Sequence, residues 1–312
     1  MELTTINILT KNQSEIIKTV LYFDMFQYPL KHNEVYQSIT EKQTIEEFDK
    51  NLKLLVDEGL VKHKNGFYFN INSNEEIITR RIKGNLLAEK MLPLAHKYCY
   101  KVAKFPFISG ICISGGLSKN YYDKNSDIDY FVITKPNRLW ICRTLFILFY
   151  KTLSQKKREF YCLNYFISES DLVIPDNNKF VATELAYLLP SVNYDIYTTV
   201  LAHNNWYKEL HPNKPQLPNV NTKTTPNPII KRIIESLFPG KLGNWIDDKL
   251  LIITLNHWRK KYPEMSQEDF DLQFRSRKHV CKRHSHGSQN KALKMWQEKI
   301  SEFEIQNQIS LK

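Results

Sequence analysis

Residues 111–134 read ICISGGLSKNYYDKNSDIDYFVIT, and this stretch decides the fold. It contains an apolar run, the glycine pair Gly115-Gly116, a polar spacer, and a second apolar run that opens with Asp127-Ile128-Asp129. This order predicts a strand, a tight turn that leads into a short helix, and a second strand. Because side chains alternate across a strand, Asp127 and Asp129 should share one face, and the apolar residues between and after them should point to the other.

Two neighbouring carboxylates beside a glycine turn predict a site for a metal ion and an anion. Mg²⁺ prefers carboxylate oxygens and often completes its shell with water and phosphate oxygens. Gly115 and Gly116 have no Cβ, so their backbone amides can approach an oxyanion closely. The short helix expected over residues 117–122 would add the hydroxyl of Ser118. The alternative is a surface hairpin in which these residues serve only as turn residues.

The combined pattern resembles the signature of the nucleotidyltransferase superfamily, the DNA polymerase β-like fold, in which an apolar residue, Gly, and Gly or Ser precede a spacer and Asp-x-Asp or Asp-x-Glu. The resemblance implies an α+β fold with a mixed sheet core and helices. It implies that Asp127 and Asp129 hold Mg²⁺ or Mn²⁺. The triphosphate of an NTP would be bound by Gly115, Gly116 and Ser118. The implied reaction is transfer of a nucleoside monophosphate to a hydroxyl acceptor.

Members of this superfamily usually carry a third acid on a later strand, and here the chain departs from the pattern. The resemblance covers residues 107–167 and ends in a third expected strand, 160–167, whose polar inward position is Asn164. An amide carbonyl can ligate a metal, but it carries no charge and cannot serve as a general base. Glu159 and Glu169, at the two ends of that strand, are alternative sources of the third carboxylate.

The composition is that of an ordinary globular protein, with 312 residues, 42% hydrophobic and 25% charged. Residues 1–14 are polar, so no signal peptide is expected. The apolar runs 139–153 and 250–255 are too short to span a membrane and are expected as buried helices. The five cysteines are scattered and mostly lie in apolar runs, which predicts reduced thiols in a cytoplasmic protein.

Three segments are expected, namely residues 1–72, 73–215 and 216–312. The net charge of +11 is distributed over them as −2, +6 and +7. This asymmetry favours an anionic substrate or a nucleic acid near the second and third segments. The third segment should be basic and mainly helical, behind an extended linker at residues 211–228 that is rich in Pro, Asn and Thr.

Residues 1–72 predict a winged helix-turn-helix, with helices over 14–25, 31–39 and 44–58 and a wing hairpin between residues 60 and 69. Such domains often read DNA through the third helix. Here that helix carries five acidic residues against two lysines, which would repel phosphates. We therefore expect this domain to pack against the rest of the chain or to bind a partner, and DNA binding is not expected.

Residues 73–103 predict a helical connector that opens with a capping box at Ser73 and kinks at Pro93. Arg80 and Arg81 lie side by side on this connector. They are interpreted as part of a solvated basic face, with contact to a substrate as the alternative.

Two further features carry chemistry-bearing side chains. Arg143, on the apolar helix over 139–153, is interpreted as an interface arginine, with contact to phosphate as the alternative. The stretch RSRKHVCKRHSHG, residues 275–287, lacks the paired spacing of structural zinc sites. Its metal-type side chains are His279, Cys281, His284 and His286. It is interpreted as a solvated basic face, with contact to an anionic partner such as RNA as the alternative.

Two functions remain open at this point. The first is an Mg²⁺-dependent nucleotidyltransferase that uses an NTP and a hydroxyl acceptor, which in members of the superfamily is a protein, an RNA or a small molecule. The second is a nucleotide-binding or adaptor protein that kept the fold and lost turnover, which would agree with Asn164 in place of the third acid.

Overall fold

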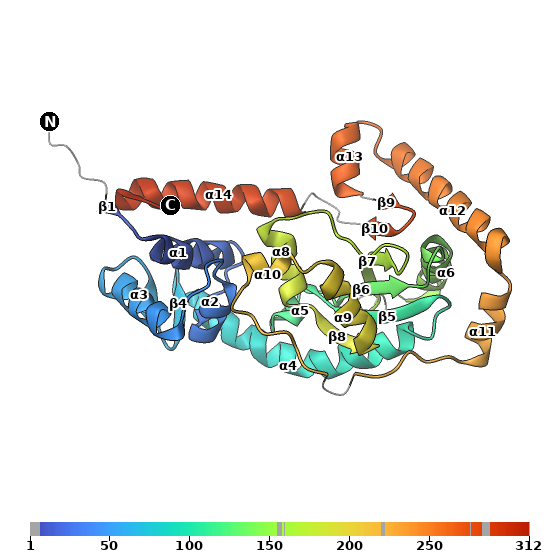
Figure 1. Ribbon diagram of the computed structural model, residues 1–312, viewed down its shortest axis with the longest axis horizontal. Helices are drawn as coiled ribbons and strands as arrows, with labels where there is room; N and C mark the ends of the chain where they lie inside the picture. The colour runs from blue at the N-terminus through green and yellow to red at the C-terminus, as the bar shows by residue number, and fades with distance from the viewer. Residues whose placement is uncertain are drawn as a thin grey trace.

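A computed structural model of the chain describes residues 7–154, 158, 160–219, 222–274, 276–282 and 288–311. It shows an α+β protein (Figure 1). A mixed six-stranded sheet covered by helices forms the larger part, and a smaller N-terminal unit packs its helices around a three-stranded sheet.

The central sheet has the strand order β8-β5-β6-β7-β10-β9. Its strands are β5 (Ile108–Ile113), β6 (Asp129–Thr134), β7 (Cys162–Ser168), β8 (Leu189–Val192), β9 (Ser276–Arg277) and β10 (Val280–Lys282). β6 and β7 run parallel, and each other neighbouring pair is antiparallel. The sheet is therefore mixed, as the sequence predicts.

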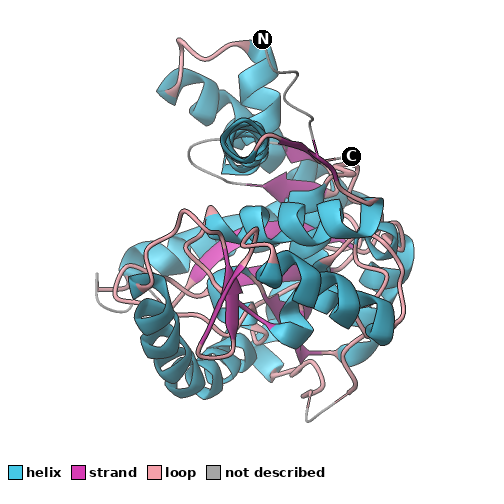
Figure 2. Ribbon diagram, turned by 90° about the vertical axis from the view of Figure 1, so that its left-hand side faces the viewer, coloured by secondary structure: helices cyan, strands magenta, loops and turns pink. Residues whose placement is uncertain are grey.

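Helices cover both faces of this sheet (Figure 2). One face packs against α4 (Glu76–Val102), α6 (Leu139–Thr152) and α12 (Gly240–Lys261), and the other against α8 (Lys179–Ala186), α9 (Tyr194–His203) and α10 (Tyr207–Leu210). Strand β6 alternates between them, because Tyr130 and Val132 are buried on the first face and Phe131 and Ile133 on the second. By the same alternation, Asp129 belongs to the face of α8.

Residues 216–312 are shared between the two parts of the molecule (Figure 1). Strands β9 and β10 extend the central sheet, α11 (Ile229–Ser236), α12 and α13 (Gln267–Gln273) flank it, and α14 (Ser288–Asn307) lies on the N-terminal unit. The run 250–255, expected to be buried, is only partly so, since Ile252 and Ile253 in α12 are 50% and 61% exposed.

The N-terminal unit contains three helices and three short strands in residues 9–72. They are α1 (Lys11–Asp24), α2 (His32–Ser38) and α3 (Ile45–Asp57), with antiparallel strands in the order β2 (Leu30–Lys31), β4 (Phe67–Phe69) and β3 (Lys62–Lys64). Thr10 and Thr44 cap α1 and α3, each accepting a hydrogen bond from the N–H three residues later. The second and third helices lie within one residue of their predicted bounds, whereas α1 begins three residues before its predicted start because Thr10 and not Ser14 caps it.

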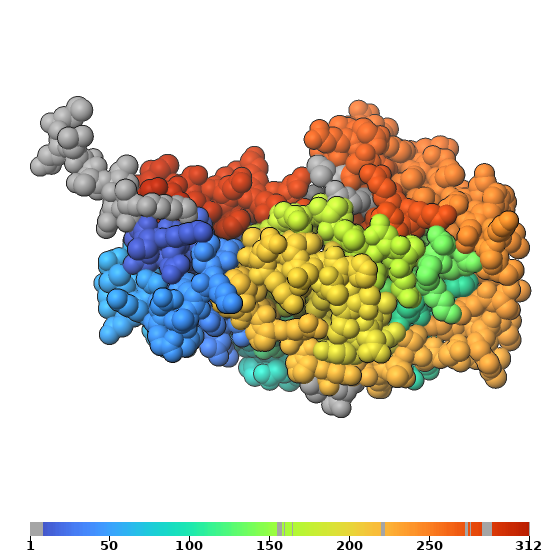
Figure 3. Space-filling model, viewed as in Figure 1, coloured from blue at the N-terminus to red at the C-terminus, as the bar shows by residue number. Residues whose placement is uncertain are grey.

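Helix α14 lies along α1, far from it in sequence (Figure 3). The indole N–H of Trp296 donates to the carbonyl of Lys18 at 2.9 Å, and Lys299 pairs with the buried Asp24 at 2.6 Å. Strand β11 (Ile309–Ser310) pairs in parallel with β1 (Asn7–Ile8). The core of the N-terminal unit is therefore completed by residues from the other end of the chain.

The connector is one long helix, α4, which runs beneath both parts of the molecule and contains Pro93 (Figure 1). The capping box predicted at Ser73 is not formed. The Ser73 hydroxyl donates to Asp24 instead, and the side-chain oxygen of Asn74 accepts from the N–H of Glu76 at 3.0 Å. The Ser73 hydroxyl therefore binds the last residue of α1 and does not cap α4.

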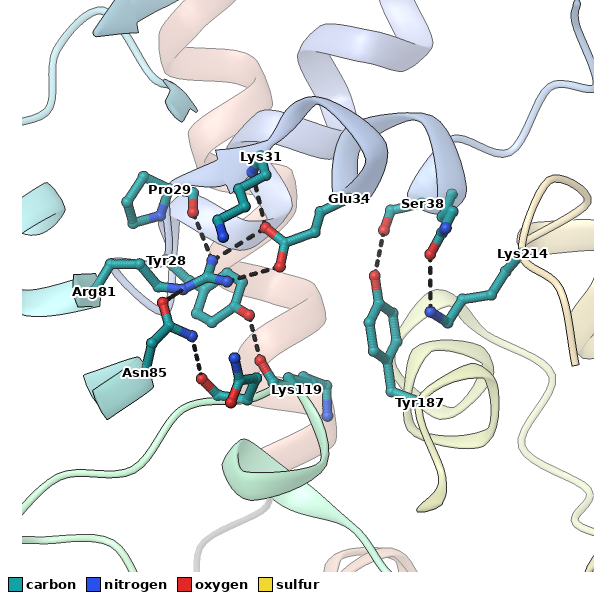
Figure 4. Close-up of polar contacts among 12 residues, drawn as sticks. Tyr28, Pro29, Lys31, Glu34, Ser38, Arg81, Asn85, Lys119, Tyr187 and Lys214 are labelled. Carbon is teal, nitrogen blue, oxygen red and sulfur yellow. Dashed lines mark hydrogen bonds and ion pairs between the residues drawn. The ribbon is translucent and has the colours of Figure 1, made fainter. Parts of the chain in front are cut away.

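Arg81, expected on a solvated face, is buried between the two parts (Figure 4). Its guanidinium lies 3.6 Å above the ring centroid of Tyr28 and donates to the carbonyl of Pro29 and to the carboxylate of Glu34, both at 2.7 Å. The Tyr28 hydroxyl in turn donates to the carbonyl of Lys119. The N-terminal unit is therefore tied directly to the turn that follows β5.

A second buried basic side chain lies at the interface between the two parts of the molecule. Lys179, the first residue of α8, donates from Nζ to the carbonyl of Ser38 at 2.6 Å and to that of Leu210 at 3.1 Å. Burial lowers the pKa of Lys179 to about 7. The side chain joins the two parts through hydrogen bonds that a neutral amine can also donate.

No helix in the described residues is both long and apolar enough to cross a lipid bilayer. The five cysteines are free thiols and four of them are buried, in agreement with the prediction of reduced core residues. Burial raises the pKa of Cys99 to about 12, so this thiol stays protonated at neutral pH.

We predict that Lys179 makes stability depend on pH. Its pKa is about 7 in the folded protein against an ordinary value of 10.5 for lysine. Between these values the unfolded state binds more protons, so the free energy of unfolding rises with pH, by at most ~1.4 kcal/mol per unit. Lys179→Met should not show this rise, because methionine does not titrate. Its free energy of unfolding should also be lower at every pH, because both hydrogen bonds are lost. Chemical denaturation near pH 7 and pH 9.5 measures the effect, and parallel profiles for the two proteins would contradict it.

Candidate functional site

The glycine turn and the paired aspartates meet because β5 and β6 are antiparallel neighbours. Ile113, the last residue of β5, lies opposite Tyr130 in β6. The N–H of Ser114 donates to the carbonyl of Asp129 at 2.9 Å. Gly115 follows Ser114, so the turn begins beside the first residue of β6.

Gly115 is required at its position by backbone conformation and by space. Its φ is +69°, in the left-handed region that glycine tolerates. A Cβ on this residue would lie 2.2 Å from Oδ2 of Asp129. The carboxylate of Asp129 therefore lies against the bare backbone of the turn, as the sequence predicts for an acid beside a glycine.

Asp127 and Asp129 project to the same side, and a third side chain joins them. One carboxylate oxygen of each aspartate and Sγ of Cys162 all lie within 4.8 Å of one another. Ile128, between the two acids, is fully buried in the core. Cys162 is the partner of Asp129 in the parallel β6–β7 pair. The sequence analysis missed Cys162, because the register between β6 and β7 is known only from the structure.

The third position of the resemblance can be tested only in part. Asn164 lies in β7, but its side chain and the whole of Glu159 fall outside the described residues. The N–H of Glu169 donates to the carbonyl of Thr134, the last residue of β6. At about 3.3 Å per residue, this end of β6 lies roughly 17 Å from Asp129. The suggestion that Glu169 supplies the third carboxylate is therefore wrong.

The N–H of the turn already donates to a carboxylate. Gly115 N–H donates to Oε2 of Glu184 at 3.2 Å, and Nζ of Lys119 lies 2.8 Å from Glu184 and 3.1 Å from the carbonyl of Gly115. Gly115 and Gly116 are the first two residues of the short helix α5 (Gly115–Ser118). The sequence analysis missed both side chains as functional candidates. Glu184 was missed because α8 is distant in sequence, whereas Lys119 lies only four residues after Gly115.

Ser118 was expected to offer its hydroxyl to a triphosphate. In the structure it is buried, and its hydroxyl donates to the carbonyl of Gly115 at 2.9 Å. Helix α5 begins two residues before the helix expected over 117–122, so position 118 falls in its last turn. In this state the hydroxyl stabilises the turn.

Two cavities lie on either side of this turn. The larger, about 590 Å³, lies between the N-terminal unit and the turn, and Phe26 and Arg80 line it. The smaller, about 260 Å³, is lined by residues of β6 and β7, among them Asp129. Gly115 lines both. The turn thus separates two chambers, one of which contains a member of the acid cluster.

The other sequence candidates do not join the acid cluster. Arg143 is buried, with its guanidinium 4.9 Å from the ring centroid of Trp258, which agrees with its interpretation as an interface arginine.

The interpretation of residues 275–287 as a solvated basic face is wrong for the part of the stretch that the structure describes. Cys281 and Lys282 are buried in β10, and Lys282 lines the smaller cavity beside Asp129. Nε2 of His279 lies 3.4 Å from Asp171. His284 and His286 fall outside the described residues. Among described residues, the acid pair with Cys162 is the one group of metal-type side chains found.

Comparison with known proteins found no matching family model, no matching curated protein and no matching solved structure. The function is therefore argued from the chemistry of the residues that the fold brings together.

We predict that Gly115→Ala destabilises the protein more than backbone strain alone would. The added methyl would overlap Oδ2 of Asp129, and a left-handed alanine costs a further ~1–2 kcal/mol. Gly66→Ala is the matched control, because Gly66 has φ +77° and no atom within 4 Å of an added Cβ. Thermal denaturation should show the larger loss for Gly115→Ala. Equal losses would show that a methyl group at position 115 and the carboxylate of Asp129 do not compete for the same space.

Proposed function

We propose that this protein is a divalent-metal-dependent nucleotidyltransferase, with the polymerase β-like core that the sequence pattern resembles. The reaction would transfer a nucleoside monophosphate from an NTP to a hydroxyl acceptor. The observation that carries the proposal is the position of Asp127 and Asp129, because one carboxylate oxygen of each lies within 4.8 Å of the other and Asp129 lies against Gly115.

The donor set fits a hard divalent cation. Mg²⁺ typically takes one or two protein carboxylates and completes its shell with water and phosphate oxygens. Asp127 is exposed and Asp129 is half-buried, so water and a phosphate can reach both. Such an ion would neutralise charge on the triphosphate and polarise the reacting phosphoryl group. Sγ of Cys162 is a softer donor, so the two carboxylates are the residues that would hold Mg²⁺ or Mn²⁺.

The chain's own groups would then position the triphosphate. The backbone of Gly115 and Gly116 offers a surface without side chains, and Lys119 is a cation directly beside it. A phosphate at this turn would compete with Glu184 for the N–H of Gly115. We infer that Glu184 then gives up both contacts, which frees Lys119 to pair with the phosphate. Attack by the acceptor hydroxyl on the α-phosphorus would release pyrophosphate.

The N-terminal unit would serve as a winged-helix-like interaction domain. Its third helix, α3, is the acidic one, and Asp49 on it contacts His32 at 2.6 Å. Lys64, in the basic hairpin, pairs with Glu75. These contacts favour a role within the protein over binding of DNA, whose backbone requires many accessible cations.

A second candidate is a nucleotide-binding protein without turnover. Two observations favour it. The third member of the acid cluster is the thiol of Cys162, and Glu184 accepts the hydrogen bond from the N–H of Gly115. The two candidates share the metal and nucleotide site and differ in whether pyrophosphate is released.

We predict that Asp127→Ala and Asp129→Ala each lower pyrophosphate release from NTP and Mg²⁺ by at least ~100-fold, because loss of metal-based charge stabilisation costs several kcal/mol. Asp57→Ala is the control, since Asp57 is exposed at the end of α3, away from the cluster. Saturable NTP binding without pyrophosphate release in the wild type would favour the second candidate. Turnover that survives both substitutions would contradict the proposal.

Cys162→Asp should strengthen binding of Mg²⁺ by roughly tenfold, because it adds a third hard, charged ligand beside Asp127 and Asp129. Cys162→Ser is the control, since it has a similar size and a neutral oxygen. Isothermal titration with Mg²⁺ measures both affinities. If Cys162→Asp binds no more tightly than Cys162→Ser, the side chain at 162 does not face the ion.

A further inference from the structure

The larger of the two cavities lies where the N-terminal unit meets the glycine turn. It is enclosed by the end of α1 and the residues that follow it, by the start of α4, by the segment from Gly115 to Ser126, and by Phe180, Thr183 and Glu184 of α8. Its volume is about 590 Å³, within the ~300–1,000 Å³ of small-molecule sites, which often lie at domain interfaces. The 260 Å³ chamber on the other side of the turn falls below that range.

The wall of this cavity is rich in aromatic rings. Tyr22, Phe26, Tyr28 and Tyr121 all line it. Phe26 is 46% exposed, although it follows directly on a buried helix, and its ring meets that of Tyr22 edge-on at 5.7 Å. An exposed aromatic side chain in a cavity wall offers a surface on which a flat ring can stack.

Cations lie beside these rings. The guanidinium of Arg80 lies 5.4 Å from the ring centroid of Tyr121, and it contacts Asp123 at 3.4 Å. Lys119 lines the cavity near Gly116. The partner acids of these cations, Asp123 and Glu184, line the same cavity. A cavity that combines aromatic rings, two cations and a bare glycine backbone fits a ligand that has a planar heterocycle and a phosphate chain.

The walls are held in place before any ligand arrives. The ring of Tyr121 lies so close to α4 that a Cβ on Gly84 would be 2.3 Å from its Cε2. Tyr28 is fixed by the guanidinium of Arg81 on its ring and by its hydroxyl bond to Lys119 (Figure 4). The cavity therefore depends on the N-terminal unit for one wall and on the core for the other.

From this arrangement we propose that the interdomain cavity holds the base and ribose of the NTP, while its phosphates lie on Gly115 and Gly116. This assignment rests on the proposed function. It makes the N-terminal unit part of the nucleotide site. The acceptor would then approach through the smaller cavity, which Asp129 lines.

Equilibrium dialysis with Mg²⁺ tests the assignment, using ATP, GTP, CTP and UTP in one set and inorganic tripolyphosphate in another. Phe26→Ala removes the exposed ring, and Gly84→Ala displaces the ring of Tyr121 from its place in the wall. Each should weaken binding of the preferred NTP by roughly fivefold or more, which is the lower end of the contribution of a base stacked on an aromatic ring. Affinity for tripolyphosphate, which has no base, should not change.

Leu86→Ala is the matched control, because Leu86 lies on α4 with 55% exposure and does not line the cavity. It should bind NTP and tripolyphosphate as the wild type does. Unchanged NTP affinity in both cavity variants would overturn the assignment and leave the proposed function standing. An equal loss for NTP and tripolyphosphate would also overturn it. A wild type that binds neither ligand would contradict the proposed function, and this assignment with it.

Discussion

The contact between the Asp129 carboxylate and the backbone of Gly115 is the constraint on which the rest of the site depends. Any side chain at position 115 would occupy the space of Oδ2. Antiparallel pairing of β5 with β6 brings the two residues together, and alternation along β6 turns Asp129 toward α8 while its neighbours fill the opposite core. One strand pairing thus fixes the positions of an acid, a turn and the surface between them.

The same turn is where the two parts of the molecule are joined. Arg81 holds Tyr28, and Tyr28 donates to the carbonyl of Lys119, whose amine lies beside Gly115. A displacement of the N-terminal unit would therefore be transmitted to the segment that would receive a phosphate. The guanidinium of Arg81 can be buried here because Glu34 and the carbonyl of Pro29 are its partners, whereas an unpaired buried charge would be costly. This explains why Arg81 is buried, although a pair of arginines usually marks a solvated face.

The sequence predicts the parts of the structure that depend on local signals. The two strands around the glycine pair, the helices of the N-terminal unit and the shared face of Asp127 and Asp129 follow from alternation, capping and apolar spacing. Contacts between distant segments are not encoded locally, and they were missed. Cys162 enters the acid cluster through the register of a parallel strand, and Glu184 reaches the turn from α8. Glu169 was misplaced for the same reason, since only the register of β6 and β7 shows that it lies at the wrong end.

A crystal structure with Mn²⁺ and a non-hydrolysable NTP analogue tests the central claim most directly, because the anomalous signal of manganese locates the ion unambiguously. The account predicts a manganese peak within bonding distance of Asp127 and Asp129, with the phosphates on Gly115 and Gly116. A manganese peak elsewhere, or phosphates bound away from this turn, would contradict it.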